Sequence, residues 1–270
     1  MKFLKFLVVL TIGITCCMNL TSCSSEDEPK PNIEVGNGTV NPATVFANGI
    51  PQKVGGMNIS VNSDGLVSAL TDGSVKITFE YPCMSRATEA DVIMNVKDGD
   101  DDDFVVYVTL NGLGYSSYWK IVYDQEDVEE YWFEYNTAEQ LKKIKVKNDE
   151  TNATVEYSYE NGNIVSATLF PIEDEFSLKI SYGTTLIKNN GGVMIWDMYG
   201  FEWGEEMQYA YYAGILGKAT ASLPEKQEVY AEGELDIEIY TWSINDKGLP
   251  TKVTRKYSDS DYTEDMLFVW

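Results

Sequence analysis

The sequence predicts an all-β protein: an antiparallel meander of about a dozen strands, curled into a half-barrel or a barrel, with one short helix packed against it. From about Lys53 onward, apolar and polar residues alternate with a period of two, which is typical of strands with one buried face. Runs of this kind occupy residues 76–81, 155–159 and 176–182. Turn sequences separate the runs, at residues 62–65, 72–73, 111–112, 161–162 and 245–248.

The first 22 residues have the pattern of a signal peptide. Lys2 and Lys5 precede an apolar stretch, residues 6–18, that is too short to span a bilayer. The following Leu20-Thr21-Ser22-Cys23 resembles the bacterial lipobox, in which the cysteine is acylated and becomes the first residue of the mature protein. We therefore expect residues 1–22 to be removed and Cys23 to attach the protein to a membrane through its lipid.

Residues 23–50 are predicted to form an acidic, proline-containing tether. The run Ser-Ser-Glu-Asp-Glu at 24–28 resembles the tract that sends Bacteroidota-type lipoproteins to the outer face of the outer membrane. Pro29 and Pro31 continue the segment as an extended linker. We expect a lipid-anchored, surface-exposed outer-membrane protein in which residues 51–270 form a single β-rich domain.

Within that domain, further strands are predicted at residues 91–97, 104–110, 117–123, 129–135, 163–170, 235–244, 251–257 and 264–270. In another strand, Lys143, Lys145 and Lys147 line one face, and Ile144 and Val146 line the other.

Residues 205–218 break the period of two and predict the helix. Acidic residues occupy its first turn, and Met207, Tyr211, Gly214 and Ile215 fall on one face at helical spacing. A single helix among strands usually covers the open face of a curled sheet.

The turns carry a weak internal repeat. Ile59-Ser-Val61-Asn62-Ser-Asp-Gly65-Leu66 parallels residues 242–249, and residues 133–141 fit the same pattern with Glu139 in the place of the glycine. Residues 157–162 fit it with one residue fewer. Glycine supplies the positive φ that such a turn requires, so Glu139 leaves the type of its own turn open.

Three segments support a family resemblance: Asn-Ser-Asp-Gly-Leu-Val at 62–67, Phe-Glu-Tyr-Asn at 133–136, and Tyr-Ala-Tyr-Tyr-Ala-Gly-Ile-Leu-Gly-Lys-Ala-Thr at 209–220. With them, the chain resembles a Bacteroidota outer-membrane lipoprotein family of unknown function, described with a porin-like β fold. The resemblance covers roughly residues 50–270 and implies a fold but no activity. A membrane-spanning barrel is one alternative. We favour a water-soluble curled sheet instead, because the polar faces of the strands carry many carboxylates.

Composition excludes several classes of function. Acidic residues outnumber basic ones 43 to 20, for a net charge of −23, which argues against nucleic acid as a partner. The chain has no histidine, so His-ligated zinc, proximal-His haem and histidine-based nucleophile activation are excluded. Cys83 is the single thiol left after processing and acylation, so no internal disulfide forms. We expect no cofactor.

Asp98, Asp100 and Asp102 form a weak candidate site for a structural calcium ion, because alternate carboxylates on a tight loop suit that ion. The alternative is a solvated hairpin tip, since the glycine and the twelfth-position ligand of a calcium loop are missing.

Aromatic residues are the candidate binding groups: Tyr118, Trp119, Trp196, Tyr199 and Trp203. Rings exposed on a rigid sheet bind the apolar faces of sugars or anchor protein interfaces, whereas core packing is the alternative for each of them. We expect a non-catalytic binding or accessory protein whose ligand is a polysaccharide or a surface protein. The alternatives are a carboxylate-dependent glycan hydrolase, with Glu202, Glu205 and Glu206 as candidate acids, and a purely structural envelope component.

Overall fold

The computed structural model describes residues 38–82, 90–99, 103–123, 127–148, 152–170, 176–195, 205–231, 233–258 and 260–270. All of them belong to the compact unit Ile33–Trp270. The predicted signal peptide and Cys23 lie outside the described residues.

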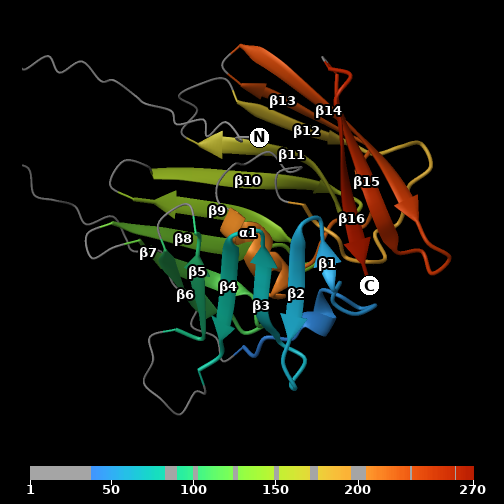
Figure 1. Cartoon of the computed structure of the whole chain (residues 1–270). Helices are drawn as coiled ribbons and strands as arrows, with labels where there is room; N and C mark the ends of the chain where they lie inside the picture. Colours follow the sequence, from blue (N-terminus) through green and yellow to red (C-terminus); the bar gives the residue numbers. More distant parts are fainter. Residues whose placement is uncertain are drawn as a thin grey trace, which may run out of the picture. The chain divides into compact units, whose positions relative to one another are not determined.

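Sixteen antiparallel strands form one closed barrel within this unit, and each strand pairs with its neighbours in the sequence (Figure 1). The ring closes where β1 pairs with β16, with Lys53 opposite Val269 and Val54 opposite Phe268. The predicted all-β meander is therefore confirmed, with more strands than expected. The strands are β1 (Lys53–Val54), β2 (Met57–Val61), β3 (Val67–Asp72), β4 (Val75–Glu80), β5 (Val92–Lys97), β6 (Phe104–Leu110), β7 (Ser116–Val122), β8 (Val128–Tyr135), β9 (Leu141–Lys147), β10 (Asn152–Glu160), β11 (Asn163–Phe170), β12 (Ser177–Ser181), β13 (Lys226–Ala231), β14 (Glu234–Ile244), β15 (Pro250–Tyr257) and β16 (Thr263–Val269).

The wall of the barrel has a largely apolar inner face and a charged outer face. On β9, Ile144 and Val146 are buried inside, and Lys143, Lys145 and Lys147 alternate with them on the outside, as predicted.

Some apolar side chains do lie on the outer face. Leu235 and Ile239 of β14 are exposed, and so is Leu267 of β16. The outward residues of β15 between them, including Lys256, are polar, so these side chains do not form a continuous band around the barrel.

No helix of the described residues has the length and apolar character that crossing a membrane requires.

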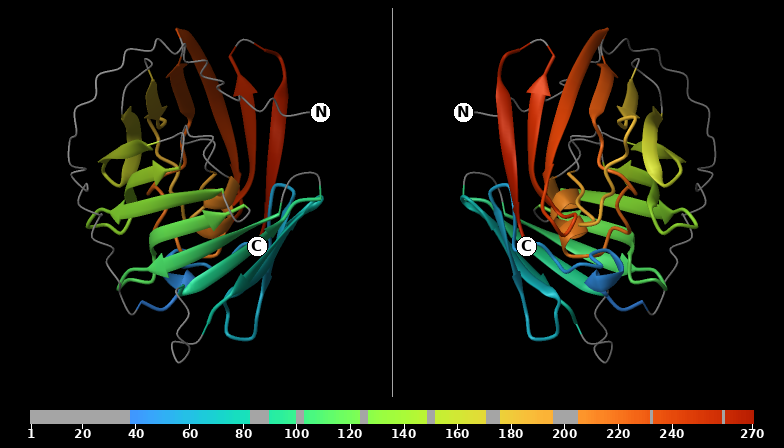
Figure 2. Two further views of the ribbon diagram at one scale, coloured as in Figure 1. Left: turned by 90° about the vertical axis from the view of Figure 1, so that its left-hand side faces the viewer. Right: turned by 90° about the vertical axis from the view of Figure 1, so that its right-hand side faces the viewer.

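Helix α1, Glu205–Tyr212, lies inside the ring of strands (Figures 1 and 2). It was expected to cover an open face of the sheet, but the sheet is closed and the helix fills the interior. Its side chains from Tyr209 to Tyr212 are all at most 6% exposed. Phe46, which follows the short 3-10 helix η1 (Pro42–Thr44), stacks on Tyr212 with ring centroids 5.7 Å apart.

The helix is shorter than the predicted span of 205–218 because Gly214 ends it. Gly214 has a φ of +82°. Its amide donates a hydrogen bond to the carbonyl of Tyr211 at 2.8 Å, and the amide of Ile215 donates one to the carbonyl of Ala210 at 3.2 Å. This left-handed glycine termination satisfies the last carbonyls of a helix.

The repeat is present at 62–66, 136–140 and 245–249, as predicted, and also at 111–115. In each copy, the side-chain oxygen of an asparagine accepts hydrogen bonds from the amides two and four residues later, at 2.9–3.1 Å. The asparagines are Asn62, Asn111, Asn136 and Asn245. The residue three positions after the asparagine has a positive φ in all four turns, and in one of them it is Glu139, at +63°. The predicted copy at 157–162 has a different turn, in which Asn161 and Gly162 both have positive φ.

A second repeat lies at the same end of the barrel. An aromatic side chain near the end of an even-numbered strand donates to a backbone carbonyl near the start of the strand before it. Each such bond ties together the two strands of a hairpin at their open end. The donor and acceptor pairs are Tyr81–Val67, Tyr135–Ser116, Tyr159–Leu141, Tyr182–Ile164, Trp242–Pro224 and Trp270–Pro250.

Candidate functional site

The structure separates the two adjacent rings that were predicted to bind a ligand. Trp119 is fully buried inside the barrel, with its ring centroid 4.7 Å from that of Phe133. It belongs to the core and cannot stack on a ligand outside, because alternation places neighbouring residues on opposite faces. Tyr118 lies on the outer face of β7. The other three candidates, Trp196, Tyr199 and Trp203, lie outside the described residues.

Tyr118 lies beside a second ring, that of Trp132, on the outer face of the barrel. The two residues are register partners on β7 and β8, and their ring centroids are 5.6 Å apart. The hydroxyl of Tyr118 donates to Oε1 of Glu130 at 2.6 Å. Burial raises the pKa of Tyr118, and Glu130 raises it further, so this hydroxyl remains a proton donor at neutral pH.

The pair belongs to a straight row of outward side chains. Trp132 faces Lys145 of β9, whose ammonium lies 5.8 Å from the centroid of the indole ring. In the adjacent row, Tyr107 of β6, which is 39% exposed, faces Lys120 of β7. Lys120 faces Glu130, which in turn faces Lys147 of β9. We call this surface the aromatic–lysine face: Tyr107, Tyr118, Lys120, Trp132, Lys145 and Lys147.

Sequence reasoning did not single out Trp132, which lies in the run Tyr131-Trp132-Phe133. Alternation shows that Trp132 points away from its two neighbours, but it does not show which face is inside. The register with β7 settles this, because Trp119 faces the buried Tyr131 and Tyr118 faces Trp132.

The acidic candidates are only partly described. Asp98 follows β5, but Asp100 and Asp102 lie outside the described residues. Among the residues that are described, no group of three or more carboxylate or cysteine side chains could hold a metal ion.

A carboxylate of β8 points into the barrel. Glu129 accepts hydrogen bonds from the Tyr131 hydroxyl at 3.0 Å and from Nδ2 of Asn148 at 2.8 Å. Burial raises the pKa of Tyr131, and the negative charges of Glu129 and of Glu206 on α1 raise it further. Of the other predicted acids, Glu202 lies outside the described residues, and α1 begins at Glu205.

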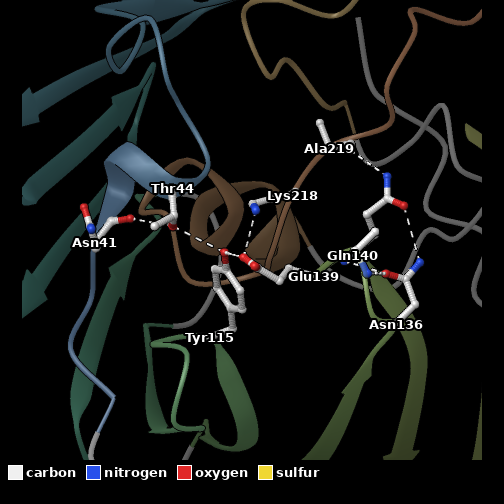
Figure 3. Close-up of polar contacts among 9 residues, drawn as sticks. Asn41, Thr44, Tyr115, Asn136, Glu139, Gln140, Lys218 and Ala219 are labelled. Carbon is white, nitrogen blue, oxygen red and sulfur yellow. Dashed lines mark hydrogen bonds and ion pairs between the residues drawn. The ribbon is translucent and has the colours of Figure 1, made fainter. Parts of the chain in front are cut away.

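The turn at Glu139 joins three parts of the chain (Figure 3). Oε2 of Glu139 accepts a hydrogen bond from the Tyr115 hydroxyl at 2.8 Å and lies 2.9 Å from the ammonium of Lys218. The Lys218 hydrogen bond and then that of Tyr115 lower the pKa of Glu139. Burial raises the pKa of Tyr115 to about 12. These bonds fasten a hairpin to the segment that follows α1, which is a structural role.

A buried ion pair lies on the opposite wall. Nη2 of Arg255 contacts both carboxylate oxygens of Glu238 at 3.0 and 3.1 Å, with the two side chains 8% and 12% exposed. The Tyr240 hydroxyl donates to the same carboxylate at 2.7 Å. The pair ties β14 to β15.

Comparisons with known proteins agree with this architecture. Residues 59–252 match the model of DUF4595, a domain of unknown function with porin-like fold. The crystal structure of a porin-like protein from Bacteroides uniformis ATCC 8492 is similar, at a TM-score of 0.59 and 18% identity over 79% of this chain and 88% of that one. The crystal structure of a porin-like protein from Bacteroides vulgatus ATCC 8482 is also similar, with a TM-score of 0.55 and 9% identity over 82% of this chain and 98% of that one. Identities this low show the fold alone. No curated protein matches this chain.

Proposed function

We propose that this chain, which belongs to the DUF4595 family of domains of unknown function with a porin-like fold, is a non-catalytic polysaccharide-binding module of the bacterial envelope. In this proposal the lipid on Cys23 anchors the protein to the outer membrane, and the aromatic–lysine face holds the ligand.

The pairing of Tyr118 with Trp132 on the outer wall is the observation that carries the proposal. Ring faces bind the apolar faces of sugars, and ring hydroxyls and nearby carboxylates bind sugar hydroxyls. The strands of a sheet are about 4.8 Å apart, so side chains on successive strands form a regular platform for an extended chain. The backbone below the rings is fixed by hydrogen bonds to strands on both sides.

Affinity electrophoresis and tryptophan fluorescence test the proposal, using the purified full-length protein and a panel of polysaccharides. We expect Trp132→Ala to weaken binding of the recognised polymer at least tenfold, because central aromatic residues dominate binding energies. Tyr118→Phe keeps the ring and is expected to lose less than Tyr118→Ala.

Tyr262→Ala is the matched control, because Tyr262 is 53% exposed and lies next to β16, outside the aromatic–lysine face. Binding that survives Trp132→Ala and Tyr118→Ala together would disprove the role of this face, and a panel without any bound polymer would disprove the function.

The inward carboxylates support a second candidate, a glycan hydrolase. Glu129 accepts a hydrogen bond from the Tyr131 hydroxyl, and the negative charges of Glu129 and Glu206 both raise the pKa of that tyrosine. Glycosidases use a pair of carboxylates in acid–base chemistry on a sugar. This candidate requires that the protein release reducing ends from a polysaccharide and that Glu129→Gln abolish the release while the fold is retained.

The anchor is tested separately. We expect metabolic labelling with a fatty acid to mark the wild type and not Cys23→Ala, and we expect protease added to intact cells to degrade the wild type. An unlabelled wild type would disprove the lipid anchor, and complete protection from protease would disprove surface exposure.

A further inference from the structure

The charge on the aromatic–lysine face differs from that of the chain as a whole. The sequence has 43 acidic and 20 basic residues. The outward positions of β7 and β9 nevertheless carry four lysines: Lys120, Lys143, Lys145 and Lys147. The carboxylates that face them across the strands are Glu130, Glu134 and Glu156.

Among the described residues, none of these carboxylates forms an ion pair within 4.0 Å with a lysine next to the rings. Glu156 pairs with Lys143 at 3.2 Å, at the far side of β9 from the rings. Glu130 lies between Lys120 and Lys147 in the register, but its bond at 2.6 Å is to the Tyr118 hydroxyl. Within the described residues, no ion pair of 4.0 Å or less involves Lys120, Lys145 or Lys147.

Two of these lysines are placed beside the rings. The ammonium of Lys145 lies 5.8 Å from the centre of the Trp132 ring, a contact that holds the cation next to the indole. Lys147 lies two residues further along the same strand and is exposed. A sugar seated on Tyr118 and Trp132 therefore has ammonium groups at its edge, within reach of an anionic substituent.

We propose, resting on the polysaccharide-binding function above, that the ligand is an acidic polysaccharide. Its uronate or sulfate groups pair with Lys145, Lys147 and Lys120, while the apolar faces of its sugars lie on Tyr118 and Trp132. An acidic protein segment would pair with the lysines, but it would not use two neighbouring rings, tilted by 51° to each other, with a hydroxyl and a carboxylate beside them. The strongly negative remainder of the surface repels such a polymer and so confines it to this face.

The experiment compares anionic polymers (polygalacturonate, alginate, hyaluronan and chondroitin sulfate) with neutral ones (fully methyl-esterified polygalacturonate, laminarin and arabinoxylan). Binding of the full-length protein is measured by affinity electrophoresis and calorimetry. We expect at least one anionic polymer to bind, and we expect binding to weaken with salt because exposed charge pairs are screened. The esterified polymer, which has the same backbone without the charge, is expected to bind at least tenfold more weakly than polygalacturonate if polygalacturonate is the polymer bound.

The double variant Lys145→Gln/Lys147→Gln is expected to weaken binding about tenfold, since exposed pairs contribute little individually. Its control is Lys252→Gln/Lys256→Gln, which likewise removes two lysines from the outer face of one strand, four positions apart on β15.

Each other outcome overturns the inference. Equal binding of neutral and anionic polymers, or no effect of the Lys145 and Lys147 changes, shows that the ligand is not selected by charge. The proposed polysaccharide-binding function stands in that case if Trp132→Ala still weakens binding. Equal losses in both double variants indicate non-specific attraction. Failure to bind any polymer overturns the proposed function as well.

Discussion

The turn at Glu139 permits a quantitative test, because a residue with a side chain occupies a backbone conformation that favours glycine. Its φ is +63°, whereas the corresponding positions of the sister turns are Gly65, Gly114 and Gly248. A left-handed conformation costs a residue with a Cβ about 1 kcal/mol or slightly more. The carboxylate offsets that cost through Tyr115 and Lys218.

Two substitutions separate the terms. Glu139→Ala keeps the strained backbone and loses both contacts, which are worth about 1–2 kcal/mol together, since the side chain is one-third exposed and its ion pair is partly screened. Glu139→Gly loses the same contacts but relieves the backbone strain. Part of that gain in stability is lost because glycine increases the conformational entropy of the unfolded chain. We expect the glycine variant to be more stable than the alanine variant by about 0.5–1 kcal/mol.

Urea unfolding, followed by both tryptophan fluorescence and circular dichroism, measures these differences and checks that the transition is two-state. The reasoning fails if the alanine variant is as stable as the glycine variant, because the turn would then impose no strain.

The pH dependence of the same site has a definite sign. The pKa of Glu139 is lowered in the folded protein, so its contacts add stability above the unfolded value of 4.5 and lose it as the pH falls through the folded value. The stability gap between the wild type and Glu139→Gln should therefore narrow in acid. A gap that is constant from neutral pH to strong acid would refute this assignment.

Three further predictions concern the core. Arg255→Met leaves Glu238 buried without its cation and should cost about 3–5 kcal/mol, whereas Arg255→Met with Glu238→Leu should cost less, as measured by urea unfolding; a double variant as unstable as the single one would contradict this. Gly214→Ala places a Cβ 2.9 Å from Cα of Pro42 at a φ of +82° and should cost about 2–4 kcal/mol. Gly49→Ala, at +93° with nothing within 4 Å, is its control and should show the backbone cost alone. Burial raises the pKa of Tyr115 from 10.0 to about 12, so its contribution to stability is complete below pH 10 and decreases as the pH rises toward 12. Ultraviolet titration should show that Tyr115 ionises together with unfolding. Ionisation of Tyr115 near pH 10 in a protein that remains folded would be inconsistent with this prediction.

The strands could be predicted because their faces differ in polarity. The predicted run 104–110 and the observed β6 coincide, and the predicted 163–170 coincides with β11. Closure could not be predicted, because alternation assigns faces but not partners. β1 contains only two residues, too few to show any period.

The candidate site was predictable only in part, for the same reason. Tyr118 and Trp119 are equally aromatic, and only the register shows that the first lies outside and the second in the core. Trp132 became a candidate only because it faces Tyr118. The helix was located correctly, but its end was not, because the helical spacing of apolar residues continues to Ile215, past Gly214, whose positive φ ends the helix.

The seam between β1 and β16 has a consequence for how this protein is made. All other strand pairings join neighbours in the sequence, most of them through short loops, although the connection from β12 to β13 runs through α1. The seam instead brings together the two ends of the barrel sequence and has only two register pairs. Closing so long a loop costs more entropy and comes late in folding. Until Val269 is available, the free edges of the unfinished sheet are exposed to other chains, and such edges promote aggregation. The open sheet can therefore pair with other chains until the last strand has been synthesised and has paired with β1.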